Sequence, residues 1–146
     1  MLSDFVELTQ AVEDFCAFIE TLPRSSLKGK TWGPQSVLAH LVYYHELYVR
    51  QAQAFLDGKP VRLFRGTYRE LNSQIASSHR DIPIPQLVRR FRTANRRLGK
   101  IYMTCDPDHI VISIKEGVQP YSLNKLVPAV TSHVRNHHRE IKKIRS

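Results

Sequence analysis

Cysteine, methionine and tryptophan are scarce in this chain of 146 residues, which holds two, two and one of them. Two cysteines are too few for the several disulfide bridges that stabilise small secreted domains. Cys16 and Cys105 lie in apolar, helix-like segments, so we expect both to be reduced core residues of a cytoplasmic protein. No apolar run approaches the roughly 20 residues that span a bilayer, and the first ten residues lack the order of a signal peptide. We therefore expect no membrane partner.

Acidic residues are also few, since 13 Asp and Glu stand against 22 Lys and Arg and leave a formal net charge of +9. Such an excess attracts polyanions, among them nucleic acid, anionic lipid and phosphorylated ligands. One expected helix carries a stripe of cations that can follow phosphates. The alternative is a solvated face that acidic neighbours partly neutralise, and nucleic acid stays a partner that we do not favour. The stripe consists of Arg89, Arg92, Arg96 and Lys100.

Apolar residues recur every three or four positions in four long segments, which is the spacing of amphipathic helices. The long helices are predicted at residues 3–22, 34–57, 85–105 and from 121 or 122 to 144, and a short one at 68–79. Pro128 falls inside the last pattern, so that helix either begins later or is kinked. The segment HIVISI alternates like a strand but has no evident partner, so we expect an irregular connection. The prediction is one all-α domain, residues 1–146, built as a four-helix bundle with one short extra helix between the second and third.

Histidine is the unusual feature of the last helix, in the segment TSHVRNHHREIKKI. His133 and His137 are four residues apart and therefore project from the same face one turn apart, whereas His138 is expected to be solvated. Two imidazoles at this spacing can hold a metal ion together with at least one further ligand. The second helix offers His40 and His45, which diverge by roughly 140°, so only one of them can join the pair. The alternative is a set of histidines hydrogen-bonded at the edge of the core.

The residues around these histidines resemble a known family. The stretch TWGPQSVLAHLVYYHELYVR, residues 31–50, resembles the tryptophan-anchored second-helix motif of the DinB-like superfamily. SHVRNHHREI, residues 132–141, resembles its H-x-x-x-H element on the last helix. In sequence, both segments are most similar to the ClbS/DfsB group of small four-helix-bundle proteins. The middle of the chain, with its Asn-bearing short helix, is also similar to that group.

The resemblance implies a DinB-like bundle, often dimeric, with a pocket between its helices. It implies one divalent metal ion, zinc, nickel or iron, held by His40, His133 and His137. Metal–nitrogen bonds of about 2.0–2.1 Å would then place the ring nitrogens roughly 3–4 Å apart. The function expected on this basis is that of a metal-dependent hydrolase or thiol transferase. Its substrate would be a small, electrophilic or toxic molecule, as in stress response or detoxification.

The alternative implied by the same group is a metal-free binding or protective protein, which would contact nucleic acid through the basic stripe. In that case Tyr44, His45 and Glu46 would line the pocket and serve as acid and base. A third possibility has no chemistry: the wide apolar face of the second helix forms a homodimer. Tyr43, Tyr48 and Phe55 would then contribute to the interface.

Overall fold

The computed structural model describes residues 2–23 and 33–145, and these form five helices and one two-stranded sheet. The class is therefore all-α, as predicted. The four long helices are α1 (Leu2–Thr21), α2 (Pro34–Leu56), α4 (Ile84–Thr104) and α5 (Leu123–Arg145), and the short one is α3 (Tyr68–Ser78). Within the described part of the chain, no helix has the length and apolar character needed to cross a membrane.

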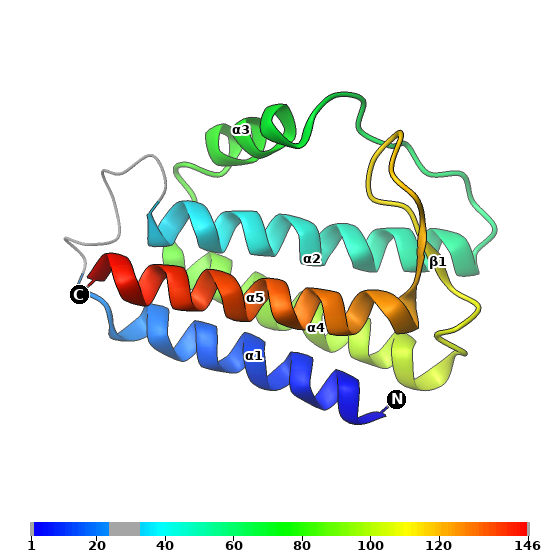
Figure 1. Ribbon diagram of the computed structural model, residues 1–146, viewed down its shortest axis with the longest axis horizontal. Helices are drawn as coiled ribbons and strands as arrows, with labels where there is room; N and C mark the ends of the chain where they lie inside the picture. The colour runs from blue at the N-terminus through cyan, green and yellow to red at the C-terminus, as the bar shows by residue number, and fades with distance from the viewer. Residues whose placement is uncertain (1, 24–32, 146) are drawn as a thin grey trace.

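The long helices lie side by side, with α2 packed on α4, α1 on α5, and α1 also on α4 (Figure 1). Their order is not a simple up-and-down series, because α2 and α4 run in the same direction (Figure 1). The chain between them must return along the length of α2, and α3 lies on this return path. This connection places α3 against α2, where it covers the region beside the histidines.

The core is built from the apolar faces that the periodicity predicted. Phe15 of α1 and Phe91 of α4 are fully buried and meet edge to face, with ring centroids 6.2 Å apart. Edge-to-face pairs of this kind are favoured by the charge distribution of aromatic rings. Cys16 is buried beside them and Cys105 is partly buried at the end of α4, and both are free thiols, as expected. Burial raises the pKa of the Cys16 thiol to about 12, so it is neutral and unreactive.

The segment after α4 corrects the expectation of an irregular connection. β1 (Val111–Ile112) pairs with β2 (Tyr121–Ser122) in an antiparallel hairpin. The partner was missed because the two residues directly before α5 read as part of that helix. The helix itself begins at Leu123 and continues through Pro128, so the later start considered for it is wrong. The hairpin crosses over α2 and lies near the same end of the molecule as the start of α5 (Figure 1).

At Gly99, α4 packs tightly against Phe5 of α1. A Cβ atom at this position would lie 2.6 Å from Cε1 of Phe5, whose ring is buried against Tyr102. Alanine favours a helix over glycine by about 1 kcal/mol, but overpacking a core costs roughly 1–3 kcal/mol. We therefore expect Gly99→Ala to lower the free energy of unfolding by about 1 kcal/mol, measured by urea titration. Phe5→Leu should lower the free energy of unfolding less in the Gly99→Ala background than in the wild type. A Gly99→Ala protein that is more stable than the wild type would contradict the close contact with Phe5.

Candidate metal centre

Three histidines from two helices converge at one point of the structure. His40 comes from α2, and His133 and His137 come from successive turns of α5. The Nε2 atoms of His40 and His133 lie 3.0 Å apart, and one potential ligand nitrogen from each of the three lies within 4.8 Å of the others. The ring centroids are separated by 4.5 to 5.2 Å. The structure thus brings together the three residues that the resemblance selected, with one separation at the short end of the expected range.

The protonation of these imidazoles favours their use as ligands. His40 is 7% exposed, and burial lowers its pKa from 6.5 to about 3, helped by the positive charge that His137 and His133 would carry. The pKa of His133 is lowered by the same causes, burial first and His137 second, although its side chain reaches solvent. A neutral imidazole has a lone pair to offer, and only this form ligates a metal. His40 and His133 are therefore held in their ligating form at neutral pH.

Polar groups from two further positions contact the cluster. The Tyr44 ring packs on His40 with centroids 4.9 Å apart, and its hydroxyl donates to Oδ1 of Asn72 at 3.1 Å. The Asn72 side chain also interacts with His40 and favours its protonated form, although burial outweighs this effect. On the other side, Oε1 of Glu140 lies 3.4 Å from Nδ1 of His137. Outer-shell partners of this kind orient metal-binding histidines and set their tautomers. The sequence analysis assigned no role to Asn72. The feature that could have indicated one was the Asn-bearing short helix, which is similar to that of the ClbS/DfsB group.

A cavity of about 410 Å³ adjoins the cluster, with His40 and His133 in its wall. It lies between α2, α3, the start of α5 and the loop of the β1–β2 hairpin. Its lining is mostly aromatic and aliphatic: Tyr44, Tyr48, Tyr68, Tyr121, Ile114, Val118, Leu126, Ala129 and Val130, with Asn72 and the two histidines as the other polar residues. The long connection and the hairpin thus supply the walls that the four long helices alone would lack.

The three residues of the alternative acid–base group, Tyr44, His45 and Glu46, lie in three different surroundings. Only Tyr44 reaches the cavity. His45 is 1% exposed and its Nε2 lies 3.0 Å from Oδ1 of Asn95 in the core. Glu46 forms a two-point ion pair with Arg90 on α4. Consecutive helix residues turn by about 100°, so three in a row face three directions.

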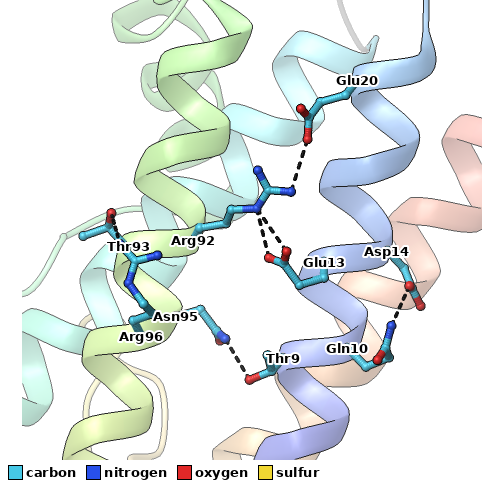
Figure 2. A network of polar contacts seen from close by, with 9 residues as sticks. All are labelled: Thr9, Gln10, Glu13, Asp14, Glu20, Arg92, Thr93, Asn95 and Arg96. Atoms are coloured by element: carbon cyan, nitrogen blue, oxygen red, sulfur yellow. Dashed lines mark hydrogen bonds and ion pairs between the residues drawn. The ribbon is translucent and has the colours of Figure 1, made fainter.

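The basic stripe is partly neutralised, as the alternative interpretation of it proposed. Arg92 donates to Glu13 at 3.0 Å and to Glu20 at 3.2 Å, both on α1 (Figure 2). Arg96 points along α4, where it donates to the hydroxyl of Thr93 (Figure 2). Arg89, Arg96 and Lys100 are exposed, but Arg92, at the middle of the stripe, belongs to the contact between α1 and α4. The stripe is therefore interrupted by a structural ion pair.

Two further expectations need correction. His138 is not solvated: its ring is half-buried against Phe15 and Phe18, with centroids 5.8 and 5.1 Å away, and burial lowers its pKa. It faces α1 because it is one residue beyond the cluster-facing His137. Tyr48 is 7% exposed and lines the cavity, so it is not available for the interface predicted with Tyr43 and Phe55.

The two segments that carry the family resemblance are those that supply the histidines. Within the second-helix motif, Thr31 and Trp32 lie outside the described residues, and the remainder forms Gly33 and the part of α2 that ends at Arg50. In comparisons with known protein families and with curated proteins, the sequence matches none. The function is argued below from the arrangement of the site.

Proposed function

We propose that this chain is a DinB-like four-helix-bundle protein of the ClbS/DfsB type, in which His40, His133 and His137 hold one divalent metal ion. One observation carries the proposal: His40 and the His133–His137 pair, more than ninety positions apart in sequence, converge with ligand nitrogens within 4.8 Å. Helix periodicity alone explains the pair on α5, but it does not explain a third imidazole brought to it by α2.

The donor set fits such an ion. Three neutral imidazoles suit zinc, nickel or iron, and a three-histidine set leaves coordination positions for other groups. Asn72 and Glu140 stand where outer-shell partners of metal-binding histidines stand in other proteins. The separations of up to 4.8 Å exceed the roughly 3–4 Å of a shared ion, so small side-chain rotations would accompany binding.

The function supported best is hydrolysis, or transfer of a thiol, at an electrophilic centre of a small molecule bound in the adjoining cavity. His40, His133 and His137 would hold the divalent ion, which would supply Lewis-acid polarisation and lower the pKa of a water or thiol nucleophile. The chain's own residues bind and orient the substrate. Asn72 and the Tyr44 hydroxyl lie at the histidine end of the cavity, where they can hydrogen-bond to a polar group of the substrate. The apolar walls exclude bulk water from the rest of it.

The experiment that tests this function uses styrene oxide as an uncharged electrophile, with the purified protein after EDTA treatment and after reloading with zinc, nickel or iron. We expect turnover only in a reloaded protein. Formation of the diol without added thiol would identify a hydrolase, and formation of the thioether with glutathione would identify a transferase. Equal rates in the EDTA-treated and reloaded proteins, with one ion bound per chain in the latter, would contradict the proposed role of the metal.

A further inference from the structure

The wall of the cavity beside the histidines is chemically unlike the surface of the molecule. The chain carries a formal net charge of +9, yet none of the described residues that line the cavity is Asp, Glu, Lys or Arg. Two other hollows, on the opposite side of α2, are lined by Arg50 and Arg97, and one of them also by Lys100. The cavity wall therefore lacks the charged side chains that line these two hollows.

Aromatic rings make up much of the wall. Tyr44 and Tyr48 are each 7% exposed and form its buried side, while Tyr68 and Tyr121, each 42% exposed, stand at its open side. Tyrosine offers a large, rigid contact surface with little loss of side-chain freedom. Leu126 and Val130 of α5 complete the buried side. A wall of this composition favours a flat, apolar ligand over a strongly hydrated one.

Apart from the hydroxyls of the other tyrosines, the polar groups of the wall lie together at one end of the cavity. His40 and His133 lie there together with Asn72, whose Oδ1 accepts a hydrogen bond from the hydroxyl of Tyr44. Lys115 lies against the wall, with its Nζ 5.0 Å from the centre of the Tyr68 ring at the open side. Lys115 therefore lies on an exposed tyrosine at the open side of the cavity and not beside the histidines. A ligand that fills the cavity needs one polar group at the histidine end.

We propose that the ligand of this cavity is an uncharged, mainly apolar small molecule with an aromatic ring and one neutral polar group directed at His40 and His133. The inference rests on the proposed function and specifies its substrate class. The volume of about 410 Å³ lies within the range of roughly 300–1,000 Å³ that small-molecule sites occupy. In the metal-free protein, a carboxylate or phosphate buried against this wall would carry a large desolvation penalty, because no Lys or Arg of the described lining can pair with it. The same wall disfavours a phosphorylated compound.

The test compares two probes of the same ring system, the neutral β-naphthol and the anionic β-naphthoate, by calorimetric titration at pH 7. In EDTA-treated wild-type protein, we expect β-naphthol to bind with a Kd on the order of 10⁻⁴ M, and β-naphthoate at least about tenfold more weakly. The surface charge of the chain acts in the opposite direction, since it attracts the anion. Equal or tighter binding of β-naphthoate would overturn the proposal.

A cavity-filling variant locates the binding. Ala129 is exposed on α5 and lines the cavity, so Ala129→Phe adds volume there without entering the core. We expect it to weaken β-naphthol binding by about tenfold or more. The matched control is Ala54→Phe, the same exchange on α2 in a different hollow, which should leave the affinity unchanged. Unaltered binding in Ala129→Phe would also overturn the proposal.

The same samples separate this inference from the proposed function. Zinc binding is titrated in parallel in the wild type, in Ala129→Phe and in Ala54→Phe. Selective β-naphthol binding in a protein that binds no zinc would refute the metal centre and support the ligand class. One bound zinc ion per chain, with no difference between the two probes in the EDTA-treated protein, would support the centre and refute the ligand class.

Discussion

Replacing His133 with alanine is expected to abolish specific zinc binding, with a loss of affinity of about 100-fold or more. The reason is the number of ligands: His40, His133 and His137 are the three imidazoles that the structure brings within 4.8 Å. Loss of an outer-shell partner alone costs roughly 10–100-fold in metal affinity, so loss of a ligand should cost at least as much. Affinities would be measured by competition with a chromophoric chelator.

The chain offers a matched control on the same helix. His138 directly follows His137 but packs on Phe15 and Phe18 of α1, away from the cluster. We expect His138→Ala to keep the zinc affinity of the wild type, although it removes a neighbouring imidazole. Similar losses in the His133→Ala and His138→Ala proteins would indicate nonspecific binding to the histidine-rich segment, and the proposed centre would be wrong.

Thermal unfolding supplies a second measurement that does not depend on the chelator. A ligand present at about 100 times its Kd stabilises the folded state by about 2.7 kcal/mol. For a chain of this size, that corresponds to a rise in Tm of roughly 5–10 °C. The rise should appear in the wild type and in His138→Ala and be absent from His133→Ala, while the Tm values without metal show whether each variant is folded.

Acid is expected to destabilise this protein through His45, at pH values where most of its carboxylates are still ionised. His45 is 1% exposed, and burial lowers its pKa from 6.5 to about 4. In the unfolded chain the same imidazole takes up a proton near pH 6.5. Because the unfolded state binds more protons than the folded state between these two values, stability falls as the pH is lowered through this range. The contribution of His45 to the free energy of unfolding is fully present above pH 6.5 and is lost once the pH has fallen to about 4.

The surroundings of His45 explain the direction of this shift. Its ring lies edge-on to Phe91, with centroids 4.9 Å apart, and Oδ1 of Asn95 is the polar group within hydrogen-bonding distance of its Nε2. Asn95 in turn donates to the hydroxyl of Thr9 on α1 (Figure 2). The hydrogen bond with Asn95 and the charge of Glu46 both favour the imidazolium, but burial outweighs them. The folded state therefore holds His45 neutral.

The expected size of the effect is about 2 kcal/mol of unfolding free energy lost between pH 7 and pH 5, from a shift of this size and 1.36 kcal/mol per pKa unit. His45→Gln keeps an amide that can bond to Asn95 but removes the titration. We expect it to be less stable than the wild type at pH 7 and to lose about 2 kcal/mol less on acidification, measured by urea titration in the presence of EDTA. The cluster imidazoles titrate in both proteins, so the difference isolates His45.

His109→Gln serves as the control for this prediction, because it removes a histidine whose side chain is 82% exposed. Its unfolding free energy should follow that of the wild type from pH 7 to pH 5. If His45→Gln also followed the wild type, the buried imidazole would not be the origin of the acid sensitivity.

Helical periodicity was sufficient to locate the helices of this protein. Apolar residues at spacings of three and four predicted all five within a few residues of their observed ends, because one buried face per helix is a local property of the sequence. The hairpin was missed because each strand is two residues long and pairs across a loop. The pairing of two distant dipeptides leaves no periodic signal.

The candidate site divides in the same way. Spacing alone placed His133 and His137 on one face of a helix, because side chains four positions apart nearly eclipse each other. It could not choose between His40 and His45 as the third member, which depended on the rotation of α2 about its own axis. Packing against α4 turns His45 toward Asn95 and leaves His40 facing α5.

The sequence by itself therefore determined the helices, their apolar faces and the histidine pair of α5. His40 as the third member was left open by spacing and implied only by the resemblance, and the tertiary structure brings it to the pair. The tertiary structure alone decided that Arg92 pairs with Glu13 and Glu20, and that a cavity free of charged lining among the described residues opens beside the histidines. The physical reason is that periodicity encodes which side of a helix is buried, whereas the partner it meets is set by how all the helices and the long α2–α4 connection pack together.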